Sequence, residues 1–134
     1  MNLQISILTP EKPFYTGSAD EVILATETGE MGVLRGHAPV VTGLDVGSLL
    51  IRSKEQWKAF AIMGGFALVK NNQITVLANE AETAESINVD EAKNAFETAK
   101  TTLENATDLK TKVEANFAYK RAKARYQVVT RKAA

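Results

Sequence analysis

The chain of 134 residues contains no cysteine and a single histidine, His37. The absence of cysteine excludes disulfides, thiolate metal sites and a catalytic thiol, and it fits a reducing compartment. No apolar run approaches the ~20 residues that a membrane-spanning helix needs, and the N-terminus has neither a signal-peptide nor a transit-peptide pattern. We therefore expect a soluble chain that works where it is made, and its length fits either one domain or a small domain plus an appendage.

The motifs that support catalysis or cofactor binding are also missing. His37 has no sequence-local partner for nucleophilic or acid–base chemistry, and clusters of His, Asp and Glu at metal-ligand spacing are absent. The glycines at residues 29–32 and 64–65 match neither the phosphate-binding loop nor the dinucleotide fingerprint. A lone histidine between glycine and proline is more typical of a turn or an interface than of an active site. We expect no enzyme, with no catalytic residue, no metal and no cofactor.

Charge is divided unevenly along a chain whose net charge is zero. Residues 1–109 carry 8 Lys and Arg against 15 Asp and Glu, so this part has a charge of −7. Residues 110–134 carry 8 Lys and Arg against one acid, Glu114, for a charge of +7. An acidic body with a basic tail predicts that the tail meets an acidic surface, either on a partner or on the chain itself.

Up to about residue 79 the sequence has the pattern of β-structure. Apolar and polar residues alternate in NLQISIL at residues 2–8, which is the period of a half-buried strand. Two pairs of strand-like segments flank Lys54-Glu55 and Asn71-Asn72, and each pair predicts a hairpin with a tight turn. Short strands separated by turns, with no helical pattern among them, predict a sandwich or a barrel.

From residue 80 onward glycine and proline disappear, and alanine, glutamate and lysine dominate. Asn88 and Glu91 have the spacing of an N-terminal helix cap, and a second helix is expected to begin at about Leu109. So short a connection predicts an antiparallel hairpin, and its alanine-rich interface predicts marginal stability. The expected apolar faces are Ala92, Ala95, Phe96, Ala99, Leu103 and Ala106 in the first helix, and Leu109, Val113, Phe117, Ala124 and Val128 in the second.

The strongest charged feature is YKRAKARYQ at residues 119–127. Cations interleaved with tyrosine are compatible with nucleic-acid binding, because aromatic rings stack on bases while Lys and Arg bind phosphates. The acidic remainder of the chain argues against it, and a solvated helix face or an acidic partner explains the same residues. From residues alone we predict a non-catalytic binding protein of the α+β class, with an N-terminal β-sandwich followed by an antiparallel two-helix hairpin.

Several segments carry a more specific signal. They are ISILTPEKPFYTG, TGEMGVLRGHAP within a longer matching stretch, MGGFA followed by ITVLANEAE, and EANFAYKRAKARYQ. Together they resemble the epsilon subunit of F-type ATP synthases, of the plastid and cyanobacterial type. The resemblance runs from Ile5 to about Val128, in order and without large gaps.

The resemblance implies a β-sandwich of about ten strands over residues 1–84 and a regulatory helical hairpin over residues 85–134. The sandwich is expected to bind the gamma subunit and to rest on the ring of membrane c subunits, so that it couples rotation to the catalytic head. By position in the motif, Glu30 and Met31 would lie in the loop that meets the c-ring. His37, in the next turn, would face gamma.

The resemblance also implies that the helices inhibit ATP hydrolysis. In the family they leave the sandwich, extend along gamma and reach an acidic segment of the beta subunit. The charge division and the thin interface are compatible with this movement. The candidates for the basic contact are Lys120, Arg121, Lys123 and Arg125.

One departure concerns nucleotide binding. Some bacterial relatives bind ATP at the start of the first helix through Ile or Leu, Asp, two variable residues, Arg and Ala. Here Asn88 stands in place of the Asp and Glu91 in place of the Arg. An acid where a cation should face phosphate predicts no useful ATP affinity and therefore no nucleotide-binding residues.

The implied location is peripheral, on the stromal face of a thylakoid membrane or on the cytoplasmic face in a cyanobacterium. The membrane would be met only through the c-ring, and no nucleic acid is expected as a partner. The alternative function is a free-standing binding module that uses the basic second helix for an acidic partner or a nucleic acid.

Overall fold

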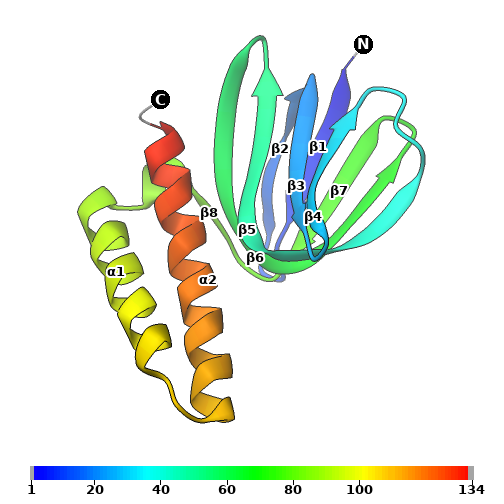
Figure 1. Ribbon diagram of the computed structural model, residues 1–134. Coiled ribbons are helices and arrows are strands. Elements are labelled where there is room, and N and C mark those ends of the chain that lie inside the picture. Colours follow the sequence, from blue (N-terminus) through cyan, green and yellow to red (C-terminus); the bar gives the residue numbers. More distant parts are fainter. Residues whose placement is uncertain (1, 133–134) are drawn as a thin grey trace.

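The computed structural model describes residues 2–132, so the end of the expected second domain, residues 133–134, lies outside the described residues. Strands come first in the chain and two helices follow (Figure 1). The short 3-10 turn η1 (Ala84–Ser86) leads to helix α1 (Val89–Asn105), and helix α2 (Leu109–Lys132) ends the described chain. The strands are β1 (Leu3–Leu8), β2 (Pro13–Ala19), β3 (Glu21–Thr26), β4 (Gly29–Leu34), β5 (Val40–Ser53), β6 (Gln56–Lys70), β7 (Gln73–Ala78) and β8 (Ala81–Thr83).

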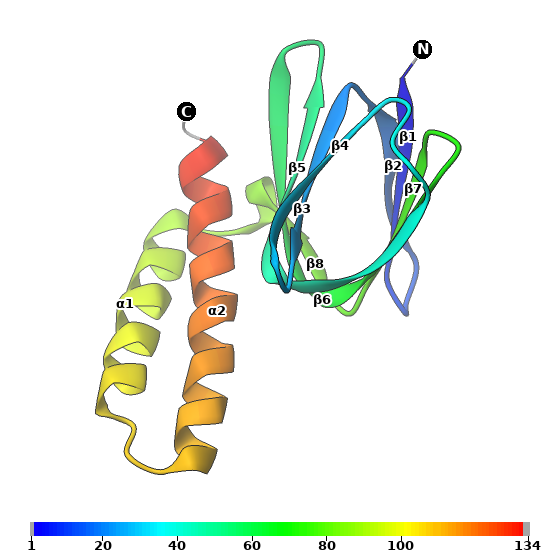
Figure 2. The same ribbon diagram turned by 45° about the vertical axis from the view of Figure 1, so that its right-hand side comes forward.

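The strands form one continuous sheet that folds into two layers, because the long strands β5 and β6 run through both (Figure 2). The start of β5 and the end of β6 join β7, β1 and β2 in the first layer, which we call layer A. The end of β5 and the start of β6 join β3, β4 and β8 in layer B. Five strand segments in each layer explain why the resemblance implies about ten strands where the described residues form eight.

Strand β6 passes from one layer to the other at a pair of glycines. Gly64 has a φ of +79° and Gly65 a φ of +140°, which lie outside the range that other residues readily adopt. A Cβ atom at Gly65 would also collide with the carbonyl oxygen of Leu77 in β7. The two glycines therefore let β6 bend while it stays paired with β7.

The two predicted hairpin turns are confirmed. Lys54 and Glu55 have φ angles of 52° and 67°, and Asn71 and Asn72 have φ angles of 51° and 61°. Two successive residues with positive φ make the tight turn whose twist matches that of the flanking strands.

The inner faces of the two layers enclose one apolar core. The alternation predicted at the N-terminus is confirmed, because Leu3, Ile5 and Ile7 are almost completely buried. The other strands contribute Val22, Leu24, Val33, Leu49, Ile51, Phe60, Ile62, Val69, Ile74 and Val76. The predicted fold class, a β-sandwich followed by two helices, is confirmed.

A polar residue directly precedes each helix, as the sequence predicts for the first one. The side-chain oxygen of Asn88 accepts a hydrogen bond from the Glu91 backbone N–H at 2.9 Å and so caps α1. The carbonyl of Asp108 accepts from the Lys112 N–H at 2.9 Å at the start of α2. A hydrogen bond from the Thr111 side chain lowers the pKa of the Asp108 carboxyl.

The interface between the helices contains more than alanine. The expected face of α1 is confirmed, and its Phe96 ring stacks between Tyr119 and Tyr126 of α2, with centroid distances of 5.6 and 5.4 Å. The two tyrosines are therefore structural side chains of the hairpin. Such aromatic pairs stabilise a contact beyond their area alone, so the predicted interface, mostly alanine with one Phe in each helix, understates this contact.

The predicted face of α2 is wrong in its first half. Leu109, Val113 and Phe117 are exposed, with 79, 61 and 54% of their surface accessible, whereas the expected Ala124 and Val128 are buried. The physical reason is that the first half of α2 extends beyond the sandwich with only α1 beside it, whereas the second half lies between α1 and layer B and has two buried stripes (Figure 1). The stripe toward α1 runs through Ala115, Tyr119, Ala122 and Tyr126 at heptad spacing.

Candidate partner-binding surfaces

Helix α2 lies against β5 and β6 of layer B, and α1 packs on the far side of α2 (Figure 1). Three of the four cations predicted for the regulatory contact are paired with acids of the sandwich. The ion pairs are Lys120 with Asp45 at 3.2 Å, Arg121 with Glu80 at 3.0 Å, and Arg125 with Glu82 at 2.9 Å.

The pair of Arg125 and Glu82 is the best shielded of the three. The guanidinium donates two hydrogen bonds to the carboxylate, at 2.9 and 3.3 Å, and the two side chains are 21 and 24% exposed. Surface ion pairs contribute only about 0–1 kcal/mol each, so the three pairs set the orientation of α2 more than they hold it in place. In this structure the basic tail thus meets the acidic surface of its own chain.

Apolar contact supplies the rest of the docking energy. A second cluster of buried residues, separate from the sandwich core, joins layer B to the hairpin. It is small, because most of its members are alanine or valine, so less apolar area is buried here than in the sandwich core. Its members are Ala61, Met63, Ala84, Ile87, Ala92, Val128 and Val129.

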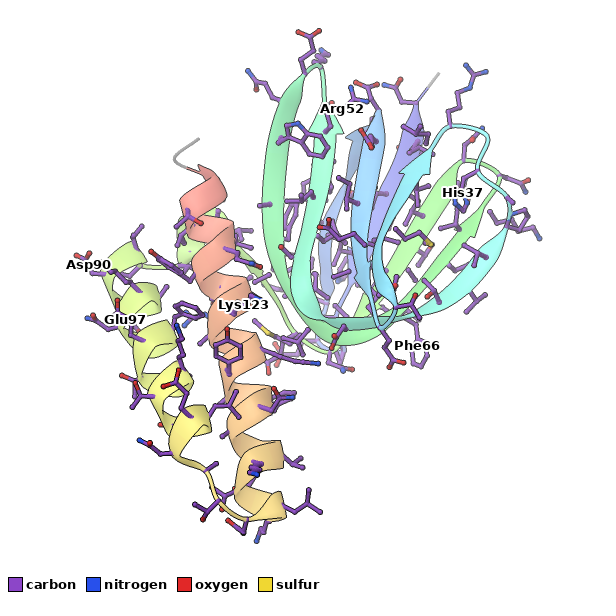
Figure 3. The ribbon with its side chains drawn as sticks, in the orientation of Figure 1. His37, Arg52, Phe66, Asp90, Glu97 and Lys123 are labelled. Atoms are coloured by element: carbon purple, nitrogen blue, oxygen red, sulfur yellow. The ribbon has the colours of Figure 1, made fainter. Side chains whose placement is uncertain are left out.

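Lys123 differs from the other three cations. Its side chain is exposed, and its Nζ lies 6.0 Å from the ring centroid of Tyr119 on the same helix. Figure 3 labels it on α2. Among the described residues it has no acidic partner within ion-pair distance.

Glu30 and Met31 lie in a strand and not in a loop, which corrects the expectation. They are in β4, directly after the turn at residues 27–28, and they pair with Ala25 and Leu24 of β3. The side chain of Glu30 is exposed, whereas Met31 packs partly against the sandwich core. Of these two residues, therefore, only Glu30 presents its side chain freely.

His37 lies in a turn, as predicted. Its backbone N–H donates to the Leu34 carbonyl at 3.1 Å, and its Nδ1 lies 2.7 Å from the Ala38 carbonyl oxygen. The turn belongs to the loop of residues 35–39, which crosses from β4 in layer B to β5 in layer A. Glu30, at the start of β4, and His37, after its end, therefore lie at opposite ends of the strand.

The outer face of layer A has an apolar patch that the sequence reasoning missed. Val41, Phe66, Leu68 and Leu77 are 69, 58, 45 and 53% exposed. Val41 pairs with Leu68 and Phe66 with Leu77, so the four side chains are neighbours on three adjacent strands. The signal was the unbroken apolar run at residues 66–69, which predicts a strand covered on both faces. We call these four residues the layer A patch.

The described residues offer little for catalysis. Residues 2–132 contain no group of three or more His, Asp or Glu that could hold a metal ion. Within the same residues no helix is long and apolar enough to cross a membrane. The sandwich thus has an apolar patch on one face and a docked basic hairpin on the other, and exposed apolar patches of this kind are typical of protein interfaces.

Comparison with known proteins names the family. The model of the ATP synthase delta/epsilon chain β-sandwich domain matches residues 2–84, and the model of the long α-helix domain of the same chains matches residues 85–130. Similar proteins include the chloroplastic ATP synthase epsilon chains of Tetradesmus obliquus and Chlamydomonas reinhardtii. Each is 70% identical over 96% of this chain, covering 95 and 96% of the relative.

The chain belongs to the family of ATP synthase delta and epsilon chains, and the resemblance to epsilon subunits is confirmed. Its relatives are non-catalytic subunits of a rotary complex. A solved chain of the Euglena gracilis mitochondrial ATP synthase has the same fold, with a TM-score of 0.80 at 20% identity over 99% of this chain and 82% of that one. A chain of the Tetrahymena thermophila enzyme matches with a TM-score of 0.67 at 15% identity, over 96 and 97% of the two chains.

Proposed function

We propose that this chain is the central-stalk subunit of a proton-translocating F-type ATP synthase, where it couples rotation of the c-ring to the catalytic head and restrains ATP hydrolysis. The observation that carries the proposal is family membership over both the sandwich and the hairpin. The Tetrahymena thermophila structure with the same fold is of the central stalk and c-ring, which supports the same place for this chain. The sandwich, residues 1–84, would bind partners, and residues 85–134 would regulate.

The gamma subunit would bind at the layer A patch and the adjoining loop that carries His37. An exposed apolar patch on a folded domain is typical of a protein interface. Val41 of the patch follows His37 by four residues, so loop and patch form one surface on the side away from the helices (Figure 3). This surface stays open while the hairpin is docked.

The c-ring would meet the opposite end of the sandwich, at the turn before β4. Glu30 is exposed there, and its carboxylate can accept hydrogen bonds from a polar loop of another subunit. Met31, half covered by the core, would set the position of the strand and contribute less direct contact. Membrane contact would be indirect and peripheral, at the stromal face of a thylakoid or the equivalent cytoplasmic face.

The inhibitory contact would use the second half of α2. Lys123 can meet an acidic segment of the beta subunit as it stands, whereas Lys120, Arg121 and Arg125 must first leave their partners on the sandwich. The same cations therefore serve the docked hairpin and the extended one. Because each surface pair contributes little, an acidic partner can compete for them.

Co-purification tests the proposal. A tagged chain expressed in a photosynthetic host should recover gamma and the other synthase subunits from solubilised membranes. Recovery without gamma would contradict the proposed function. The alternative of a free-standing module for nucleic acid is not carried forward, because Tyr119 and Tyr126 stack inside the hairpin and three of the four cations are paired.

A further inference from the structure

The loop that carries His37 has little packing of its own. Residues 35–39 are exposed except for His37, which is partly covered. Two of the loop's hydrogen bonds are local, from the His37 N–H to Leu34 and between the His37 ring and Ala38. Among the described residues, one hydrogen bond ties the loop to a distant segment, from the Gly36 N–H to the side-chain oxygen of Asn72 at 2.7 Å.

Asn72 sits where it can fix the loop to layer A. It is the second residue of the turn between β6 and β7, and its backbone carbonyl accepts from the Gln4 N–H at 2.9 Å. The bond therefore fixes the loop to the turn that joins β6 and β7, two of the three strands that carry the layer A patch. The φ of +86° at Gly36 suits the local turn that the bond from His37 to Leu34 closes, and the bond from Asn72 holds this turn against layer A.

An asparagine at position 72 meets two requirements at once. The backbone φ of 61° favours Gly or Asn, and the bond to Gly36 needs a short side chain with an acceptor oxygen. Glycine would satisfy the first requirement and not the second. Aspartate would satisfy the second and tolerates the first.

We propose that Asn72 is a positioning residue for partner binding, which holds the loop of residues 35–39 beside the layer A patch so that His37 and the patch meet gamma as one surface. The proposal rests on the proposed function for the identity of the partner. Its structural part, that Asn72 orders the loop, stands without a partner.

Substitution at Asn72 separates its role in the hairpin turn from its role in holding the loop. Asn72→Gly keeps the turn, and an Asn-Gly pair is the preferred sequence for such a hairpin, so thermal stability should be unchanged or higher. Loss of the bond should speed hydrogen exchange at the Gly36 amide and weaken binding to epsilon-depleted synthase by about fivefold to tenfold. Asn72→Asp retains the acceptor and should restore both, and Asn71→Gly, in the same turn, should change neither.

The outcomes are distinct. Wild-type exchange at Gly36 in Asn72→Gly would overturn the positioning role, and so would faster exchange with full binding. A wild-type chain that fails to bind the depleted synthase would instead overturn the proposed function, and the exchange result would still decide whether Asn72 orders the loop.

A different observation concerns the edge of layer B. A groove of about 880 Å³ runs beside the start of β6, near the turn that it forms with β5. Its lining comes from both faces of layer B, with Trp57 and Ala59 on one side and Lys58 and Phe60 on the other. Thr83, Ala84 and Glu85 close one end of it. A space bordered in this way by both faces at a strand edge has the form of an empty strand position.

On the side away from β5, the edge of β6 has no strand partner among the described residues along this groove. Strand β8 covers β6 only from Phe60 to Ile62, and the chain then leaves the edge through η1. The Arg52 carbonyl accepts a hydrogen bond from the Asp20 N–H and therefore points away from β6. Arg52 and Trp57 are thus opposite each other in β5 and β6 without a hydrogen bond between their backbones. The backbone N–H and C=O of Trp57 therefore point to the open edge of β6. Because the direction of the backbone groups alternates along a strand, the N–H and C=O of Ala59 also point to the open edge.

The segment between β8 and α1, residues 84–88, which we call the linker, could pair with this edge of β6 if it continued the register of β8. Strand β8 pairs Thr83 with Phe60, and continuing that register would place Ala84 opposite Ala59 and Glu85 opposite Lys58. The second pair joins opposite charges across two strands, which stabilises antiparallel sheets. At present Ala84 and Ile87 are held in the cluster under α2, so the linker has two competing places.

We propose that residues 84–87 extend β8 along the free edge of β6 when the hairpin leaves the sandwich. The start of α1 would then move toward the turn between β5 and β6. That turn lies at the end of the sandwich opposite the one where Glu30 stands, because β3 pairs Glu21 with Arg52 and Thr26 with Leu44. The proposal rests on the proposed function for the release of the hairpin.

A cysteine pair tests it in the isolated full chain, which has no natural cysteine. Lys58→Cys with Glu85→Cys places two thiols on one face at a separation that suits a disulfide in an extended linker. Reversing the charge of Lys120, Arg121 and Arg125 to Glu should release the hairpin and raise the rate of disulfide formation by about tenfold.

The matched control is Lys58→Cys with Ser86→Cys, because residue 86 would face the other side of the sheet. The control pair should stay slow in both backgrounds. An equal rate for Lys58→Cys with Glu85→Cys before and after charge reversal would overturn the strand extension. Because this readout does not involve the synthase, failure of the inhibitory role leaves it standing.

Discussion

At the scale of single residues, the sequence shows which residues have a special role more readily than it shows which residues they contact. Gly64 and Gly65 are visible as a turn signal, but only the fold reveals that β6 changes layer there, beside the carbonyl of Leu77. The predicted cations of α2 likewise carry no sign of their partners, because Asp45 and Glu82 lie 75 and 43 residues away from Lys120 and Arg125. Long-range pairing of this kind depends on the register of β5 and β8, which no local pattern encodes.

Gly65→Ala should be one of the most destabilising substitutions in the sandwich. The new methyl group would meet the Leu77 carbonyl, and the φ of +140° is unfavourable for alanine. We expect a loss of more than about 3 kcal/mol in the free energy of unfolding, measured by denaturant titration. Gly43→Ala is the control, since no atom lies closer than 4.0 Å and no strained φ is involved. Equal effects of the two substitutions would contradict the account of the bend.

Arg125→Gln should loosen the hairpin more than Lys123→Gln. Arg125 holds Glu82 through two hydrogen bonds, whereas Lys123 is exposed and meets only a ring of its own helix. The expected loss of docking free energy is about 1 kcal/mol for Arg125→Gln and close to zero for Lys123→Gln. Protease accessibility of the linker measures it, and the difference should shrink in high salt. Equal cleavage of the two variants would argue against ion-pair docking.

At the scale of elements, the sandwich could be predicted better than the packing of the helices. Alternation, turn residues and the cap at Asn88 locate most strands and the start of α1. The face of α2 could not be read correctly because a helix with two neighbours has no single apolar stripe. Phe117 lies at helical spacing from Leu109 and Val113, yet all three are exposed.

The stack of three rings should be the main stabilising contact within the hairpin. Phe96→Ala removes the ring between Tyr119 and Tyr126, and we expect the helices to lose about 1–3 kcal/mol of local stability. Hydrogen exchange should accelerate at α1 amides while amides of the sandwich core keep their protection. Phe117→Ala, at an exposed position of α2, should have little effect. Sandwich amides that exchange equally faster in Phe96→Ala would show that the two parts do not open separately.

At the scale of the whole molecule, the chain presents two independent faces. The layer A patch is open, and the basic surface of α2 is mostly satisfied within the chain. The basic surface could be predicted, because the charge asymmetry is visible in the sequence. The layer A patch could not, because Phe66 and Leu68 belong to an apolar run whose pattern is typical of a buried strand. The fold therefore allows binding through one face and regulation through the other.

Nucleotide binding should not control the hairpin. The start of α1 has Asp90 and Glu91 in its first turn, and Glu91 stands where ATP-binding relatives have a cation. Carboxylates at this position repel phosphate, so calorimetric titration with ATP should give no heat of binding up to low-millimolar concentration. Binding in that range, or tighter, would contradict the prediction, and Glu91→Arg is the variant that should move the affinity upward.

The central claim is that the hairpin, once it leaves the sandwich, restrains ATP hydrolysis. The most direct measurement compares the hydrolysis rate of synthase assembled with the full chain and with a chain that ends before Asn88. The account predicts a higher rate with the shortened chain, while the sandwich still binds gamma through the layer A patch. Equal rates at equal gamma binding would contradict it.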